Sequence, residues 1–121
     1  MTPKTGPVFV TGGTGYIGRA LIEVLIEDGH RVYALVRRGS ETKLAPQAVP
    51  VIGNALDAST FVGAIPTDAT LVHLVGTPHP NPRKAAEFQR VDLASICASA
   101  AAAQQAGVRH LVYVSVAIPL R

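Results

Sequence analysis

The glycine-rich stretch TGGTGYIG at residues 11–18 constrains the fold of this chain more than any other segment. It follows the apolar run VFV at residues 8–10 and precedes a segment whose apolar residues recur at helical spacing. A strand, a tight glycine turn and a helix in immediate succession form the start of a βαβ unit. We therefore predict a strand over residues 7–11 and a helix over residues 15–28, which ends at Gly29.

The spacing of the glycines predicts a phosphate-binding turn. Gly13, Gly15 and Gly18 fit the pattern G-x-G-x-x-G, and Gly12, Gly15 and Gly18 fit the related T-G-x-x-G-x-x-G. The first glycine allows the tight bend, the middle one lets backbone approach a pyrophosphate, and the last lets the helix pack closely against the strand. Because the first N–H groups and the positive dipole end of a helix favour phosphate charge, the pattern indicates a dinucleotide site.

Two alternatives exist for this turn. A nucleoside-triphosphate loop has the pattern G-x-x-x-x-G-K-[ST], and Gly13 and Gly18 have its glycine spacing. Arg19 and Ala20 follow, so the lysine that binds phosphate and the hydroxyl that holds magnesium are missing, which argues against a nucleoside triphosphatase. The other alternative is a glycine-rich turn without a ligand, which the setting between a strand and a helix disfavours.

The rest of the chain continues to alternate between strand and helix patterns. Apolar runs predict strands at residues 31–36, 49–52, 70–75 and 110–116. Helical spacing predicts a long helix at 83–106 and short helical segments near 41–48 and 58–64. This alternation gives parallel strands with right-handed crossovers. We predict an α/β fold of three layers, a Rossmann-type parallel sheet of five strands in the order 3-2-1-4-5.

Apolar residues indicate which face of each long helix meets the sheet. In the first helix that face contains Ile17, Leu21, Val24 and Leu25, and it is widened by Ile22 and Ile26. In the second it contains Phe88, Val91, Ser95, Ala98 and Ala102.

Length and composition exclude several classes of protein. The 121 residues suit one domain, and 48% hydrophobic with 16% charged residues is not the composition of a disordered chain. No apolar run approaches the ~18 residues of a membrane helix, and the N-terminus does not resemble a signal peptide. The net charge of +3 comes from scattered basic residues, unlike the clustered charge of a nucleic-acid surface. We expect a cytoplasmic protein without a membrane span or a nucleic-acid partner.

No metal site is expected. Cys97 is the single cysteine, which excludes a disulfide framework, and we expect it to be buried. No group of His, Asp or Glu residues has the spacing of metal ligands. His73 alternates with apolar residues and is expected to be a sheet residue with one hydrogen-bond partner. His79 lies in a proline-rich loop and is expected to be solvated.

The residues after the second predicted strand bear on which dinucleotide is bound. Sites that prefer NAD place an Asp or Glu there, about 20 residues past the glycines, to bind the ribose 2′-hydroxyl. This chain has Arg37 and Arg38 instead. A guanidinium fork suits the 2′-phosphate of NADP, so we predict NADP as the cofactor, with NAD as the alternative. Two arginines that are merely solvated at a strand end are the other interpretation.

Taken together, these motifs resemble the N-terminal part of the extended and atypical short-chain dehydrogenase/reductases, which include NAD-dependent epimerases and dehydratases. The resemblance covers about residues 7–117 and rests mainly on residues 11–18. GNALD at residues 53–57 resembles the family's adenine-side motif G-D-x-x-D, with Asn54 in place of the first acid. VSV at residues 114–116 stands where the family carries its active-site serine.

The resemblance implies a set of site residues. Ser115 is the candidate catalytic residue. The implied cofactor-binding residues include three segments and the arginine pair: Gly12, Thr14, Gly15, Tyr16, Ile17, Gly18, Arg37, Arg38, Asn54, Ala55, Leu56, Leu74, Val75 and Gly76.

The chain departs from the family where catalysis is concerned. The family's general acid is a tyrosine followed four residues later by a lysine, and none of Tyr16, Tyr33 and Tyr113 has that lysine. We expect this to be the cofactor-binding region of an oxidoreductase or epimerase whose catalytic residues and unknown substrate site lie mostly outside these residues. The alternatives are a non-catalytic nucleotide-binding module, for redox sensing or structure, and an inert fragment.

The last predicted strand raises a question of partners. In the family it is covered by later strands, and here it would be an apolar edge. We expect either a truncated domain or a second chain that covers this edge, and a homodimer through the long helix is a further option.

Overall fold

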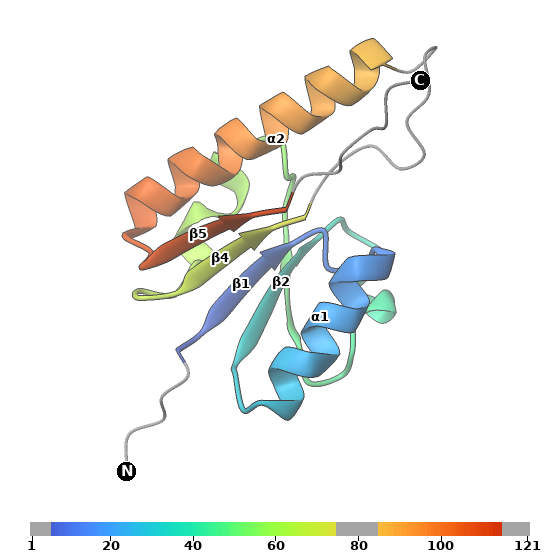
Figure 1. The fold of residues 1–121 in the computed structure, drawn as a ribbon, viewed down its shortest axis with the longest axis vertical. Helices are drawn as coiled ribbons and strands as arrows, with labels where there is room; N and C mark the ends of the chain where they lie inside the picture. Colours follow the sequence, from blue (N-terminus) through green and yellow to red (C-terminus); the bar gives the residue numbers. More distant parts are fainter. Residues whose placement is uncertain (1–5, 75–84, 115–121) are drawn as a thin grey trace.

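The computed structural model describes residues 6–74 and 85–114, except for the side chains of residues 85–89 and 92. Five parallel strands form one sheet in the order β3-β2-β1-β4-β5, as predicted (Figure 1). The strands are β1 (Val8–Thr11), β2 (Val32–Val36), β3 (Val49–Ile52), β4 (Thr70–His73) and β5 (His110–Tyr113). The helices are α1 (Tyr16–Glu27) and α2 (Ala85–Ala106), with 3-10 turns η1 (Glu41–Lys43), η2 (Ala58–Thr60) and η3 (Val62–Ala64).

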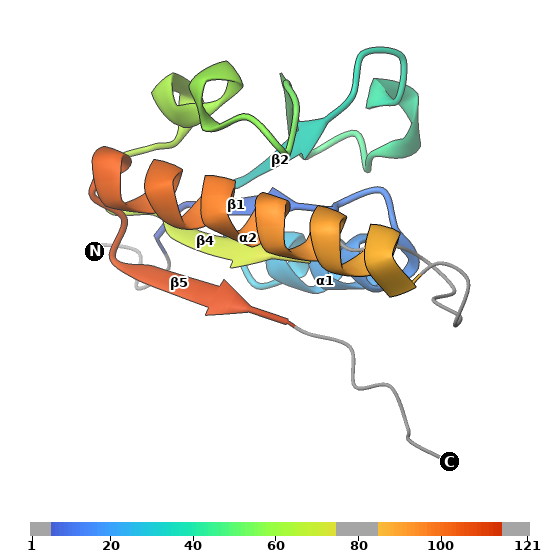
Figure 2. The same ribbon diagram turned by 90° about the horizontal axis from the view of Figure 1, so that it is seen from above.

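The two faces of the sheet are packed by different elements, which gives three layers (Figures 1 and 2). Alternate residues of each strand point to opposite faces. Val8, Val10 and Val72 pack with Ile22 of α1, whereas Phe9 and Leu71 pack with α2 and the η2–η3 segment.

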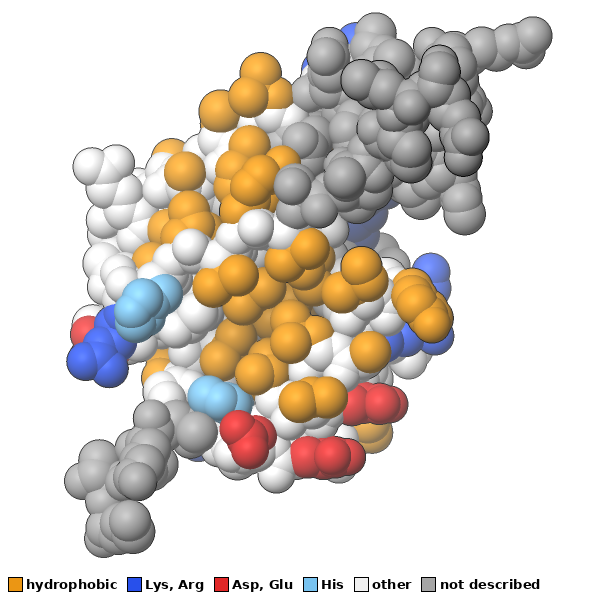
Figure 3. Space-filling model, in the orientation of Figure 1, with side chains coloured by type: hydrophobic (Ala, Val, Ile, Leu, Met, Phe, Trp, Pro, Cys, Tyr) orange, Lys and Arg blue, Asp and Glu red, His pale blue; other side chains and the backbone are white. Residues whose placement is uncertain are grey.

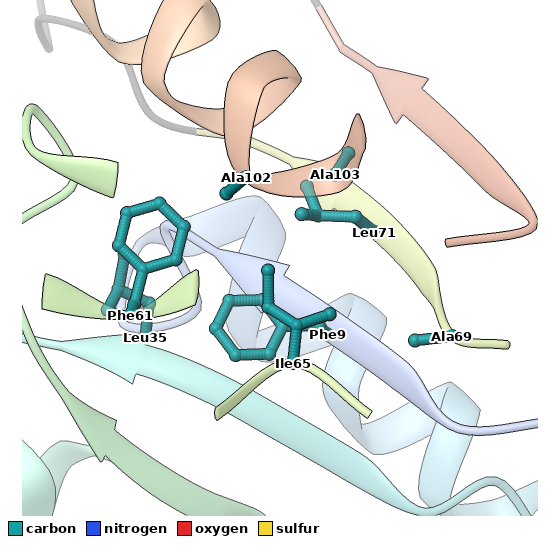
Figure 4. Packing of buried hydrophobic residues seen from close by; sticks show 8 residues of the cluster. All are labelled: Phe9, Leu35, Phe61, Ile65, Ala69, Leu71, Ala102 and Ala103. Atoms are coloured by element: carbon teal, nitrogen blue, oxygen red, sulfur yellow. The ribbon is translucent and has the colours of Figure 1, made fainter. Parts of the chain in front are cut away.

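The core on the α2 side combines large aromatic rings with a helix face of small residues. Phe9 of β1 stacks on Phe61, between η2 and η3, with ring centroids 5.9 Å apart. Ala102 and Ala103 of α2 lie over Leu71, as Figure 4 shows. The small alanine side chains allow α2 to lie close to the sheet.

The predicted face of α1 is confirmed at Leu21, Leu25 and Ile26, which are half-buried against the core, and it is wrong at two other positions. Ile22 is buried, but Ile17 and Val24 are 55% and 61% exposed. The cause is Gly18, which packs directly on the glycine turn and thereby turns the face that contains Gly18 and Ile22 toward the sheet. Ile17 and Val24, although apolar, are left toward solvent.

In α2, the predicted face is confirmed at Ser95, Ala98 and Ala102, which are buried, and at the half-buried Val91. The expectation for Cys97 is wrong: its side chain is exposed. Cys97 is two residues from Ser95 and Ser99, so it lies about 200° around the helix from each of these buried residues.

Candidate functional site

The glycine turn packs more tightly than any side chain would permit. At Gly12 the backbone has φ +78°, and a Cβ there would lie 2.9 Å from the carbonyl carbon of Leu74. At Gly18 a Cβ would lie 2.2 Å from the carbonyl oxygen of Gly12 and 2.8 Å from the Cα of Gly13. The tight bend and close helix packing expected from the sequence are therefore both present.

The N-terminus of α1 is open to a ligand. Its N-cap is Gly15, which supplies no side-chain hydrogen bond to the first helical N–H groups, and the first turn contains no acidic residue. The amide of Gly15 bonds the carbonyl of Gly12 at 3.2 Å and so closes the turn in front of the helix. An anion would meet the positive end of the helix dipole without a competing carboxylate.

A cleft of about 460 Å³ lies beside this turn. It is bounded by the glycine turn, by the segment after β2, by the segment after β3, by the end of β4 and by α2. The described residues that line it are Gly12, Thr14, Gly15, Leu35, Val36, Arg37, Ser40, Lys43, Gly53, Asn54, Ala55, Leu56, Leu74 and Val91. Ligands of open parallel sheets bind in this position, at the carboxyl ends of the strands.

The cleft brings together eight of the fourteen cofactor residues predicted from the sequence: Gly12, Thr14, Gly15, Arg37, Asn54, Ala55, Leu56 and Leu74. Gly18 is buried behind the turn, and Tyr16 and Ile17 are exposed on the first turn of α1. Arg38 is exposed and does not line the cleft. Val75, Gly76 and the candidate catalytic Ser115 lie outside the described residues, as does His79.

Asn54 belongs to a local hydrogen-bond network that shapes the cleft wall. Its side-chain Oδ1 accepts a hydrogen bond from the backbone amide of Leu56 at 2.9 Å. Its backbone amide donates to Oγ1 of Thr60 at 2.8 Å. Asp57 caps η2, because its carboxylate accepts a hydrogen bond from the backbone amide of Ser59 at 3.1 Å. The side-chain oxygen of Asn54 therefore already has one partner, and its second lone pair can still accept a hydrogen bond from a ligand.

Sequence reasoning did not find several lining residues. Ser40 and Lys43 reach the cleft from the loop after β2, and Val91 reaches it from α2. Of these three, Lys43 could have been predicted from the sequence. It is a second cation in the loop that follows Arg37, and two cations after the second strand favour a phosphate more than one does. Val91 depends on the packing of α2, which no local pattern gives.

Two classes of site are not found in the part of the chain that the structure describes. There, no three His, Cys, Asp or Glu side chains are grouped so that they could hold a metal ion. Nor does this part contain a helix with the length and apolar character needed to cross a membrane.

These features define a Rossmann-type dinucleotide-binding domain. The family model described as NAD(P)H-binding matches residues 12–118. A 3-beta-hydroxysteroid dehydrogenase of Mycolicibacterium neoaurum is 32% identical, over 89% of this chain and 31% of its own length. The Bordetella bronchiseptica enzyme WbmG, solved in complex with NAD, is 27% identical with a TM-score of 0.71, over 88% of this chain and 36% of that one.

A solved UDP-galactose 4-epimerase shares the fold, with a TM-score of 0.78 at 24% identity over 92% of this chain and 38% of that one. The chain thus belongs to the NAD(P)H-binding family, within the extended short-chain dehydrogenase/reductase and epimerase group. It spans about a third of the length of the curated relatives it matches.

Gly18→Ala should lower the free energy of unfolding by about 1–3 kcal/mol, because its Cβ would collide with the backbone of Gly12. Urea denaturation followed by circular dichroism measures the change. Gly63→Ala is the matched control, because a Cβ there meets no atom within 4 Å. Equal denaturation midpoints for the two variants would contradict the close packing of α1 on the turn.

Proposed function

We propose that this chain is the NADP-binding region of a short-chain dehydrogenase/reductase-like oxidoreductase or epimerase. The observation that carries the proposal is the place of Arg37, which lines the same cleft as Gly12 and Gly15. Lys43 lines that cleft as well, and none of the described lining residues is Asp or Glu. A cleft with two cations and no carboxylate suits a dinucleotide with an additional phosphate.

Each part of the cleft has a role in this proposal. The glycine turn and the first N–H groups of α1 bind the pyrophosphate, and Arg37, Lys43 and Ser40 bind the adenosine 2′-phosphate. Asn54 and the segment after it bind the adenine side. When bound, the nicotinamide dinucleotide supplies hydride transfer, and the chain's own residues hold and orient it.

NAD is the alternative cofactor, and WbmG, a relative of similar fold, was solved with it. The two cofactors differ by one phosphate, so the cations beside the cleft decide between them. Arg37 and Lys43 are both exposed at the surface, which places their charges where an incoming 2′-phosphate can meet them.

NADPH should raise the melting temperature of this chain more than NADH at equal concentration. A ligand at 100 times its dissociation constant adds about 2.7 kcal/mol to stability, which a thermal-shift titration detects. Arg37→Ala should weaken NADPH binding by about tenfold and leave NADH binding nearly unchanged, since a charged hydrogen bond to phosphate is lost.

Arg38→Ala is the matched control, because the neighbouring arginine does not line the cleft. Equal losses in Arg37→Ala and Arg38→Ala, or equal affinities for NADPH and NADH, would contradict the assignment of Arg37 to the 2′-phosphate. No shift with either cofactor would contradict autonomous binding by this chain.

A non-catalytic nucleotide-binding module is the second candidate. The two candidates differ in whether the protein has the family's Tyr-x-x-x-Lys pair, which does not occur within these 121 residues. Tyr16, Tyr33 and Tyr113 are followed at that spacing by Ala20, Arg37 and Ala117. A Tyr-x-x-x-Lys pair elsewhere in the same natural polypeptide would decide for the enzyme.

We also propose that a second copy of this chain pairs with the edge of β5. This strand is at the end of the sheet, and Leu111, Val112, Tyr113 and Val114 are 39–44% exposed. Figure 3 shows hydrophobic side chains gathered over β5 and α1 on one face of the molecule. An apolar strand at the end of a sheet favours association with another strand.

Light scattering after size exclusion should show dimers whose fraction rises with protein concentration. Val112→Glu should abolish them, because the carboxylate would lie at the paired edge. Leu93→Glu, on an exposed position of α2, is the control and should leave them unchanged. A dimer that survives Val112→Glu and is lost in Leu93→Glu would place the contact on α2 instead.

A further inference from the structure

A cluster of buried polar side chains lies beneath the floor of the cleft. His73 of β4 is fully buried, and its Nδ1 lies 3.0 Å from Oγ1 of Thr11 and 2.9 Å from Oγ of Ser99. Its Nε2 lies 3.2 Å from Oγ of Ser95. Thr11, Ser95 and Ser99 are fully buried as well. Because a hydroxyl can donate or accept, each ring nitrogen has a suitable partner in either neutral tautomer.

This cluster attaches α2 to the sheet at two points. Ser95 and Ser99 are four residues apart and therefore lie on the same face of the helix. One bonds Nε2 and the other Nδ1 of the same imidazole ring. A shift of α2 along its axis by even one residue, 1.5 Å, would stretch both hydrogen bonds at once.

The apolar contacts of α2 fix its position along the sheet much less. Among the side chains of α2 that the structure describes, Ala102 and Ala103 are the buried members of the core on this side, Ala106 packs against it, and Ala98 is buried nearby. Helices are normally held in register by large side chains that fill grooves on the neighbour. Over residues 98–106 of the described helix, an alanine face allows a close approach but offers little resistance to sliding, and there the hydrogen bonds to His73 supply a constraint on the register.

The register of α2 matters because the helix contributes to the cleft. Val91, one turn before Ser95, lines it. The other members of the cluster also adjoin lining residues: Thr11 precedes Gly12, and His73 precedes Leu74. The amide of Leu74 donates to both the carbonyl oxygen and Oγ1 of Thr11, at 3.1 and 3.2 Å. Three walls of the cleft therefore meet at this one cluster.

We propose that His73 is a positioning residue for the dinucleotide cleft, which through Ser95 and Ser99 holds α2 in the register that places Val91 opposite the glycine turn. The expected effect on the affinity for a dinucleotide rests on the proposed function. The register of α2 itself does not depend on any ligand.

The test compares His73→Leu with the triple variant His73→Leu/Ser95→Ala/Ser99→Ala. In the single variant, Ser95 and Ser99 lose their ring partner inside the core, which should lower stability. In the triple variant the serine hydroxyls are removed as well, so the melting temperature should return toward that of the unaltered chain. Gln104→Ala, at an exposed position of α2, is the control for a substitution on the same helix.

The first readout is amide hydrogen exchange without a ligand. In the triple variant, amides of residues 91–99 should exchange about tenfold faster, the equivalent of one lost hydrogen bond, while those of β1 and β2 keep their protection. Unchanged exchange over residues 91–99 would overturn the proposal that the cluster holds α2.

The second readout is the affinity for NADPH, which should stay about tenfold weaker in the triple variant although its stability has recovered. If affinity recovers together with stability, the cluster has a structural role only and the positioning role is overturned. Failure of the proposed function is recognised separately, because the unaltered chain would then bind no NADPH. In that case hydrogen exchange would still test whether the cluster holds α2 in its register.

Discussion

The close approach of Gly18 to the backbone of Gly12 and Gly13 is the constraint on which the rest of the structure depends. It brings the first turn of α1 against the end of β1, and thereby determines which side of α1 faces the sheet. It also leaves the N-terminus of α1 directed at the cleft, with no side-chain cap and no carboxylate in the first turn. The packing of α1 and the phosphate recognition that we propose thus depend on the same absence of a side chain.

On the opposite face of the sheet, the structure relies on small residues and buried hydroxyls. The alanines of α2 permit a close approach to β4. Directional hydrogen bonds, which alanine cannot form, come from four fully buried residues: His73, Ser95, Ser99 and Thr11. Buried polar groups of this kind serve specificity better than stability, since their desolvation offsets much of their hydrogen bonding. The cleft lies between the closely packed glycine turn and α2, the helix that we propose the polar cluster positions.

Much of the fold was predictable because each strand and helix carries a local signal. The strand order, the parallel pairing and the turn at residues 11–18 followed from apolar runs and glycine spacing. The exposure of Ile17 and Val24 was not predictable, because apolar residues occupy much of the circumference of α1 and only contact with the glycine turn chooses among them. Cys97, Val91 and the partners of His73 depend on how α2 packs on the sheet, and no spacing within one segment encodes that. The lining residues that were predicted lie in the turn after β1, directly after β2 and β3 and at the end of β4, whereas Ser40 and Lys43, farther along the loop after β2, and Val91 on α2 were missed.

The measurement that tests the central claim most directly is the change in backbone amide resonances of this chain when NADPH is added, followed residue by residue by NMR. The account predicts that the largest changes fall on Gly12, Thr14, Gly15 and Tyr16 in the turn, with further changes at Arg37 and Ala55. Saturating changes confined to those segments would place the dinucleotide in the cleft. Changes that do not saturate, or that fall elsewhere while the turn stays unaffected, would contradict the account.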